Sequence, residues 1–273
     1  MKIFFLKIYR FIFCRKLFYG INLNVYKLAL RGIGVLNSGE LKVTGEKYLL
    51  EVIIPKLKIK TVFDIGANDG GYSLILKKSL PSTSIYAFEP HPETFIKLQG
   101  NTRKTGIRVF NVGFGNKEGT KMLYDFAEDA ELKYTQPTST LASLNKYVIE
   151  SLHGQKSKSY KVKLATIDSF CKKNKIKSID FLKIDTEGSE YQVLKGATNL
   201  LKKNKIEIIL FEFNEMNVYS RIFFKDFIDI LPNYNIYRLM PDGLLSISDY
   251  QPKLHEIFAY QNIVAIEKNI SLG

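Results

Sequence analysis

The segment Thr61–Gly71, with the sequence TVFDIGANDGG, constrains the fold of this chain more than any other stretch. Its first four residues predict a short buried strand. Gly66 and Gly70 then permit a tight turn with positive φ and a close approach of the backbone to a ligand. Residues 72–80 follow with apolar side chains at helical spacing. Strand, glycine turn and helix in this order predict an α/β domain whose ligand lies across the helix N-terminus.

The glycine spacing of this turn distinguishes between cofactors. A dinucleotide fingerprint, G-x-G-x-x-G, needs its second glycine so that the backbone can reach the pyrophosphate. Asn68 stands there, and its side chain would crowd a diphosphate. The pattern that is present, acid-x-Gly-x-x-x-Gly, suits a ligand with no phosphate but with an amino-acid end, such as S-adenosylmethionine; it consists of Asp64, Gly66 and Gly70. Glu89 follows the next predicted strand and could accept both ribose hydroxyls, but NAD enzymes also place an acid there.

The composition favours a globular domain of a reducing compartment over a disulfide-rich or zinc protein. With 273 residues and 45% apolar content, the chain can bury one substantial core. Its two cysteines lie far apart in the sequence, which indicates a reducing, cytoplasmic compartment, and its three histidines are scattered, which argues against a histidine-based zinc site.

The net charge of +13 is concentrated at the start of the chain. Residues 1–60 hold twelve Lys and Arg against three Glu, a net charge of +9, and the remaining 213 residues carry +4. The first acid is Glu40. We therefore expect residues 1–44 to form a basic, aromatic-rich helical extension, with a catalytic domain over residues 45–273 and an insertion at about 117–165.

The first 20 residues combine cations with bulky apolar side chains. Lys7 and Arg10 interrupt the apolar run, which disfavours both a secretory signal and a spanning helix. A helix lying on an anionic membrane surface, at the inner face of the membrane, is one interpretation. A helix packed on the domain as a lid or dimer arm is the other. Nucleic acid is not an expected partner because the cations alternate with aliphatics, and the oligomeric state is left open.

The rest of the chain alternates between predicted strands and helices. Strands are expected at residues 108–112, within the insertion at 122–126 and 160–164, and at 206–213, with a hairpin over 236–247 and a last strand at 263–266. Four acids follow or end predicted strands: Asp64, Glu89, Asp185 and Glu212. Since ligands of open α/β sheets bind beyond the carboxyl ends of the strands, we expect these acids on one rim.

Four sequence blocks together resemble the FkbM family of S-adenosylmethionine-dependent methyltransferases. They occur in family order within residues 45–267, namely Val62–Ser73, Ala87–Pro92, Asn111–Gly115 and Lys183–Glu190 with its continuation to Gly196. The resemblance implies an α/β, Rossmann-like class I methyltransferase fold with a mostly parallel seven-stranded sheet whose last strand is antiparallel. It also implies methylation of a hydroxyl on a sugar or polyketide-type acceptor. For this chain we expect a cell-surface polysaccharide or a lipid-linked sugar.

The resemblance also implies roles for individual residues. The turn would hold the methionine end of the cofactor, Glu89 its ribose, and the segment from Asn111 its adenine. The implied cofactor-binding residues are Asp64, Gly66, Ala67, Asn68, Gly70, Glu89, Asn111 and Gly113.

Methyl transfer to a sugar hydroxyl needs removal of a proton, so a base or a metal is expected. Asp185 is the first candidate for the base and Glu187 the second, whereas His91, between two prolines, is interpreted as a turn residue. By analogy with catechol-type methyltransferases, Asp185, Glu212 and Asn214 could form an oxygen ligand set for Mg²⁺.

Two other functions stay open from the sequence. An NAD-dependent sugar dehydrogenase or epimerase would have the same α/β fold, although Asn68 opposes it. A cofactor-binding module without catalysis, serving as partner of a glycosyltransferase, would differ from an enzyme at Asp185.

Overall fold

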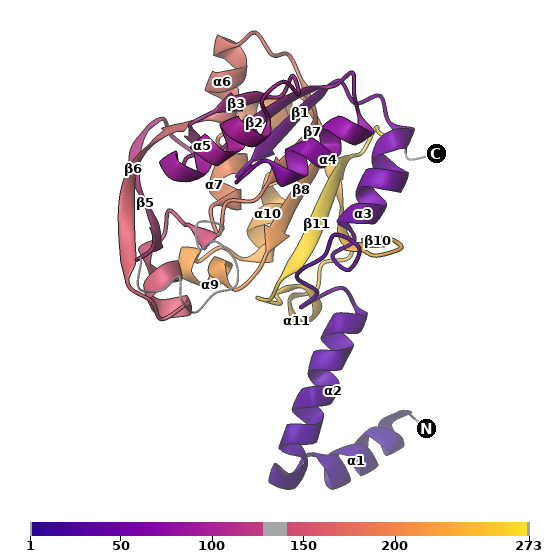
Figure 1. Cartoon of the computed structure of the whole chain (residues 1–273). Helices are drawn as coiled ribbons and strands as arrows, with labels where there is room; N and C mark the ends of the chain where they lie inside the picture. The colour runs from indigo at the N-terminus through magenta and orange to yellow at the C-terminus, as the bar shows by residue number, and fades with distance from the viewer. Residues whose placement is uncertain (1, 128–140, 272–273) are drawn as a thin grey trace.

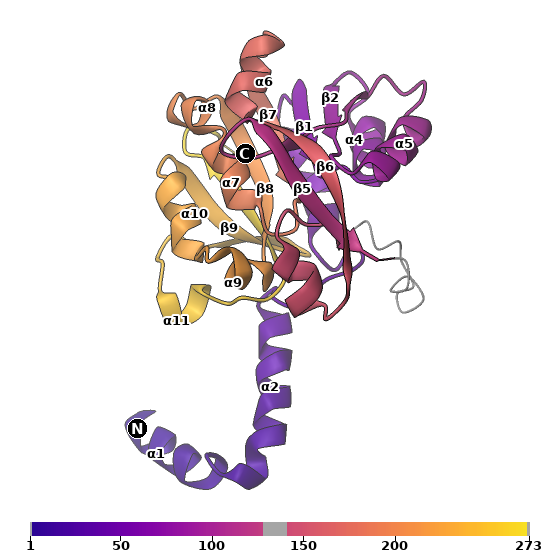
Figure 2. The ribbon, with the colours of Figure 1, turned by 90° about the vertical axis from the view of Figure 1, so that its left-hand side faces the viewer.

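The computed structural model describes residues 2–127 and 141–271, and it shows an α/β body from which a helical arm projects (Figures 1 and 2). The polar loop predicted at residues 135–140 lies outside the described residues.

One mixed sheet runs through the body in the order β10-β9-β11-β8-β7-β1-β2-β3. Five of these strands, from β3 to β8, pair in parallel, and β11 is antiparallel to both β8 and β9. The expected parallel sheet with an antiparallel last strand is confirmed, but there are eight strands rather than seven because the predicted hairpin adds β10 at the edge. The bounds are β1 Thr61–Ile65, β2 Ser84–Phe88, β3 Arg108–Phe110, β7 Ile179–Ile184, β8 Ile206–Phe213, β9 Tyr234–Met240, β10 Gly243–Ser246 and β11 Gln261–Glu267.

Helices cover both faces of this sheet (Figure 1). One hydrophobic cluster joins the sheet to the turns after α3 and to α4 and α5, and a second cluster joins it to α6, α7, α8 and α10. The middle strand β7 is buried at every residue, as expected for a parallel strand covered on both sides. The helices are α3 Glu46–Tyr48, α4 Gly71–Ser79, α5 Pro92–Asn101, α6 Ile167–Lys173, α7 Glu190–Lys195, α8 Thr198–Lys202, α9 Met216–Ser220, α10 Phe224–Ile230 and α11 Pro252–His255.

The insertion contributes two strands to a second, three-stranded sheet. Its order is β4-β6-β5, and its strands are β4 Gly113–Phe114, β5 Gly119–Phe126 and β6 Ser157–Ala165. Both strands predicted in the insertion are therefore confirmed, and each is longer than expected. The strand predicted at 108–112 ends at Phe110, and the side chain of Asn111 instead donates hydrogen bonds to the carbonyls of Glu89 and Pro90.

The arm consists of α1 (Lys2–Phe13) and α2 (Tyr19–Gly32), which stand clear of the body in both views (Figures 1 and 2). Residues 3–13 are all exposed, so the interpretation of this helix as packed on the domain is wrong. Within the described residues, no helix is both long and apolar enough to cross a membrane.

Gly66 fixes the junction between β1 and β7. It has a φ of +81°, and a Cβ atom built on it would lie 1.7 Å from the backbone oxygen of Asp185. The neighbouring backbones are joined by the hydrogen bond from the Asp185 amide to the Ile65 carbonyl, at 2.9 Å. No residue with a side chain fits there without separating the ends of the two strands.

Gly66→Ala should therefore lower the free energy of unfolding by at least about 3 kcal/mol, since left-handed strain and a backbone clash combine. Gly100→Ala is the matched control, because that helical glycine has nothing within 4 Å of the added atom. The control should be neutral or slightly stabilising. Urea unfolding of both variants measures the difference, and equal stabilities would contradict the packing described here.

Candidate active site

A cavity of about 430 Å³ lies beyond the carboxyl ends of β1, β2, β7 and β8, where an open α/β sheet binds its ligand. Its walls also include residues of β4, of the insertion and of the loops around α9 and β11. Eight of the residues predicted from the sequence line it: Gly66, Asn68, Glu89, Gly113, Asp185, Glu187, Glu212 and Asn214.

Four other predicted cofactor residues do not line the cavity. Asp64 is fully buried on the face of the sheet, where its Oδ2 accepts a hydrogen bond from Ser73 Oγ at 2.6 Å. Ala67 is buried, Gly70 precedes α4 with a φ of +91°, and Asn111 holds the turn after Glu89. They support the turn, and direct contact of these four with a cofactor stays a prediction of the resemblance.

Glu89 is held by the backbone at the end of β2. Its Oε2 accepts the amide N–H of Asn68 at 3.0 Å and its Oε1 accepts that of His91 at 2.8 Å. Asn68 has a φ of 49°, a left-handed conformation that directs its amide toward this carboxylate. Burial raises the pKa of Glu89 to about 7, although the two backbone hydrogen bonds oppose the shift. The lone pairs that remain on its oxygens face the cavity and can accept hydroxyl groups.

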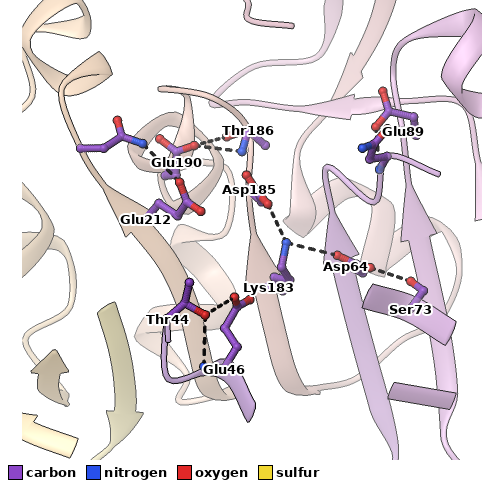
Figure 3. Close-up of polar contacts among 12 residues, drawn as sticks. Thr44, Glu46, Asp64, Ser73, Glu89, Lys183, Asp185, Thr186, Glu190 and Glu212 are labelled. Carbon is purple, nitrogen blue, oxygen red and sulfur yellow. Dashed lines mark hydrogen bonds and ion pairs between the residues drawn. The ribbon is translucent and has the colours of Figure 1, made fainter. Parts of the chain in front are cut away.

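A buried ammonium group, that of Lys183, lies between the carboxylates at the ends of β1 and β7 (Figure 3). Its Nζ is 2.8 Å from Asp185 Oδ2 and 3.9 Å from Asp64 Oδ1, and 4.9 Å from the ring centre of Tyr72. Burial alone would lower the pKa of Lys183, but the attraction of Asp185, Asp64 and Glu46 outweighs it and raises that pKa. The sequence analysis did not predict Lys183 as a site residue, although a lysine inside an apolar strand indicates a buried charge that needs a partner.

Glu46, in the segment that precedes β1, is a third acid whose charge acts on the Lys183 ammonium (Figure 3). It is buried, and its Oε2 accepts a hydrogen bond from Thr44 Oγ1 at 2.8 Å. Burial raises its pKa and the charge of Lys183 opposes that rise. No motif in the sequence singles out Glu46, because tertiary packing alone brings it beside β7.

Glu187 is the rim acid with the most constrained backbone. Its φ of 53° is in the left-handed region, and its carbonyl accepts Ser143 Oγ from the insertion at 2.6 Å. The carboxylate of Glu190 holds the same turn by accepting the amides of Thr186 and Gly188. Burial, then repulsion from three neighbouring acids, raises the pKa of Glu187 well above its ordinary value; the three are Asp185, Glu212 and Glu190. Such strain at a cavity is typical of functional positions.

The three residues of the predicted Mg²⁺ set all line the cavity but are engaged with other partners. The amide oxygen of Asn214 accepts the Met216 N–H at 3.0 Å, and its Nδ2 donates to Glu212 Oε2 at 3.3 Å. Asp185 is paired with Lys183. Among the described residues, no group of three or more His, Cys, Asp or Glu is arranged to hold a metal ion. The Mg²⁺ set of Asp185, Glu212 and Asn214 therefore stays a prediction of the analogy.

The insertion and the β11 side contribute two further ring side chains to the cavity wall, and the sequence predicted neither. His153, after the helical turn at Val148–Leu152, is half-buried, and burial lowers the pKa of its imidazole. Tyr260 lies beside Glu212, and burial raises its pKa. His91 is instead a turn residue as expected, since its Nδ1 accepts the Thr94 N–H at the start of α5.

The alternative function, an NAD-dependent sugar dehydrogenase or epimerase, would need a Tyr-x-x-x-Lys pair at its site. This spacing occurs in the chain as Tyr191 and Lys195. Both lie on α7, where the Tyr191 ring packs against Phe227 at a centroid distance of 5.6 Å. Neither residue lines the cavity.

The sheet order, the glycine turn without a diphosphate glycine and the acidic cavity together define a methyltransferase-type α/β protein. The family model of the methyltransferase FkbM domain matches residues 64–239. The chain belongs to the FkbM methyltransferase family.

Several known proteins resemble the chain at low identity. It is 22% identical over 185 residues to the 2-O-methyltransferase NoeI of Sinorhizobium fredii, covering 67% of this chain and 75% of that protein. It is 24% identical over 166 residues to the hexuronic acid methyltransferase AglP of Haloferax volcanii, covering 60% and 62%. A solved structure of methyltransferase FkbM from Methylobacillus flagellatus matches with a TM-score of 0.44 and 15% identity, covering 90% of this chain and 60% of that one.

Removing the buried ammonium should destabilise the protein in a pH-dependent way. Lys183→Met leaves Asp64, Asp185 and Glu46 without their cation, and breaking such a buried pair costs about 3–5 kcal/mol. The pKa values of Asp64 and Glu46, which burial already raises, should rise further. The folded form then binds protons more tightly than the unfolded form, so stability should recover as the pH falls from 8 toward 5.

Urea unfolding at both pH values measures this effect. Lys225→Met removes a lysine from an exposed pair with Asp229 and serves as control, with an expected change within about 1 kcal/mol. A loss for Lys183→Met that is small, or identical at the two pH values, would show that the ammonium does not balance the buried acids.

Proposed function

We propose that this protein is an S-adenosylmethionine-dependent O-methyltransferase that methylates a hydroxyl of a neutral sugar. The observation that supports the proposal is the cavity, which is lined by Glu89 near the end of β2 and by Asp185, Glu187 and Glu212 near the ends of β7 and β8. The name of one relative, a 2-O-methyltransferase, supports an oxygen acceptor. The name of another, a hexuronic acid methyltransferase, supports a sugar as acceptor, although that sugar is acidic.

The residues at the β1 and β2 ends fit S-adenosylmethionine, whose sulfonium supplies the activated methyl group when it is bound. Glu89 offers free lone pairs to two ribose hydroxyls, and Gly66 and Asn68 of the glycine turn line the cavity. A Cβ atom at Gly113 would lie 2.8 Å from the side chain of Leu164, so the absence of a side chain at Gly113 lets these two residues of the cavity wall pack closely. These features favour a nucleoside with an amino-acid end over a dinucleotide.

The residues at the β7 and β8 ends fit the acceptor hydroxyl and its proton. Asp185 is paired with Lys183, so the carboxylate of Glu187 is the freer proton acceptor of the two residues predicted from the sequence. Burial and the neighbouring acids raise its pKa, so its carboxylate is a stronger proton acceptor than an ordinary glutamate. The backbone constraints on Glu187 hold the carboxylate in place, which matters because positioning supplies much of the rate of an in-line displacement.

The charge of the rim restricts the acceptor. Four acids line the cavity at this end, and the nearby cation Lys183 is already shared with Asp64; the four are Asp185, Glu187, Glu212 and Glu215. An acidic sugar would bring another carboxylate into this field, whereas a neutral sugar offers hydroxyl donors that the carboxylates accept. We therefore expect neutral hexoses, free or lipid-linked, rather than uronic acids.

Cofactor binding should depend on pH through Glu89. A ribose hydroxyl donates to the carboxylate form, so affinity for S-adenosylhomocysteine should fall as the pH drops below the Glu89 pKa of about 7, by up to about tenfold per pH unit. Calorimetric titration at pH 8 and pH 6 measures this, with NAD expected to give no heat. Glu89→Gln should bind weakly and lose the pH dependence. Binding of NAD in place of S-adenosylhomocysteine would overturn the cofactor assignment.

Turnover should depend on Glu187 without any change in cofactor affinity. Glu187→Gln should lower kcat by about a hundredfold or more, since it removes the proton acceptor. The wild-type rate should rise with pH through the raised pKa of Glu187, and the variant should lack this rise. Release of S-adenosylhomocysteine from neutral and acidic hexose acceptors measures it, with the exposed Glu118→Gln as control. Normal turnover in the variant would transfer the role to another rim residue, and no turnover by the wild type with any acceptor would favour a non-catalytic module.

A further inference from the structure

The arm formed by α1 and α2 presents large apolar side chains to solvent without a partner in the body. Fifteen such residues between Ile3 and Leu28 are exposed, with Phe11 at 72% and Leu17 at 85%. Exposed apolar surface of this extent marks an interaction site in a soluble domain. We propose that residues 3–28 dock on the surface of an anionic lipid bilayer.

The periodicity of α1 separates its apolar and basic side chains. Phe4, Ile8 and Phe11 recur at spacings of four and three residues and lie on one face. Lys7 and Arg10, three residues apart, form a narrow basic stripe along one edge of this apolar face, where Lys7 comes four residues before Phe11. A helix with a wide apolar and aromatic face and a narrow basic stripe lies in the plane of a membrane interface, with the rings among the acyl chains and the cations at the headgroups.

The corner between the two helices extends this surface. The ring of Phe13 packs against Tyr9 at 5.0 Å and against Phe18 at 5.2 Å, and Asn22 Nδ2 donates to the Phe13 carbonyl at 3.0 Å. The guanidinium of Arg15 lies 5.2 Å from the centre of the Phe11 ring. These contacts hold α1 at the end of α2 that is far from the body, as Figures 1 and 2 show.

Charge distinguishes a lipid surface from a second copy of the chain as the occupant. Seven cations and no acid occur before Glu40, so two arms placed together would repel each other. Phosphatidylglycerol or another anionic headgroup supplies the missing negative charge, and each Lys or Arg near such a surface strengthens binding. Every acid that could pair with the arm lies on the body, from which α1 stands clear.

The end of α2 and the residues after it, 30–36, are bound to the body beside the cavity. Leu30 is buried, the Leu36 amide donates to the Tyr260 carbonyl at 2.8 Å, and Arg238 Nη1 donates to the Ile33 carbonyl at 3.1 Å. Tyr260 also lines the cavity. Docking would therefore hold the cavity at a set distance from the lipid, a consequence for a lipid-linked acceptor that rests on the proposed function. The proposal that the arm docks on lipid does not rest on the proposed function.

Co-sedimentation of the full-length protein with vesicles tests the proposal. Vesicles of equal parts phosphatidylcholine and phosphatidylglycerol should bind the protein, vesicles of phosphatidylcholine alone should bind it at least about tenfold more weakly, and salt should reduce binding. Lys7→Gln with Arg10→Gln should weaken binding about tenfold, and Phe4→Ser with Phe11→Ser should abolish it. S-adenosylhomocysteine affinity should stay unchanged in both variants, which separates this test from that of the proposed function.

Matched controls lie on the body, away from the arm. Lys172→Gln with Lys173→Gln removes the same charge from exposed positions on α6, and Ile96→Ser removes an exposed apolar side chain of α5. Both should bind vesicles as the wild type does. Equal loss in the controls, or wild-type binding by the arm variants, would overturn the proposal. So would a concentration-dependent dimer in sedimentation velocity that Phe4→Ser with Phe11→Ser dissolves, because the arm would then be an interface between copies.

Discussion

The attraction between the Lys183 ammonium and its carboxylate neighbours is the constraint on which the rest of the site depends. The parallel register of β1 and β7 sets Asp64 directly beside Lys183, so both side chains project from the same face of the sheet. Taking such charges out of water costs several kcal/mol for each ion unless each has a partner. The pair thus fixes the relative position of the two strand ends, and with it the close approach of Gly66 to the Asp185 carbonyl.

The same ammonium gives the acids of the rim different surroundings. It orients Asp185 by a direct hydrogen bond, so the carboxylate that the sequence ranked first as a base is the one already bound to a cation. Glu187, two residues later, makes no direct ion pair with Lys183, and burial and the neighbouring acids raise its pKa more than the charge of Lys183 lowers it. A carboxylate in a negative field holds a proton more readily than one beside an ammonium group. The chemistry of proton removal is therefore better suited to Glu187, and Asp185 to holding the acceptor in place.

The sequence predicted those parts of the protein that depend on local pattern. Strand, glycine turn and helix at Thr61–Ser79 have short-range signals, and so do the apolar run of β8 and the hairpin of β9 and β10. The position of Asp64 was not predicted correctly, because a strand-end acid was expected on the rim. In a strand, alternate side chains point to opposite faces, and Asp64 falls on the face that packs under α4. Glu46, His153 and Tyr260 come from segments without a motif, and long-range packing brings them to the cavity.

If the arm docks on lipid as proposed, the separation of charge along the chain gives it a second role. The cavity rim is rich in carboxylates, and an anionic lipid surface would repel it at close range. The fourteen residues of α2 span about 21 Å, at 1.5 Å per residue. The Debye length at physiological ionic strength is about 8 Å. With α1 on the lipid and α2 standing between lipid and body, the rim lies beyond the range of that repulsion. The basic arm can therefore bind the surface while the acidic cavity keeps the charge that its chemistry requires.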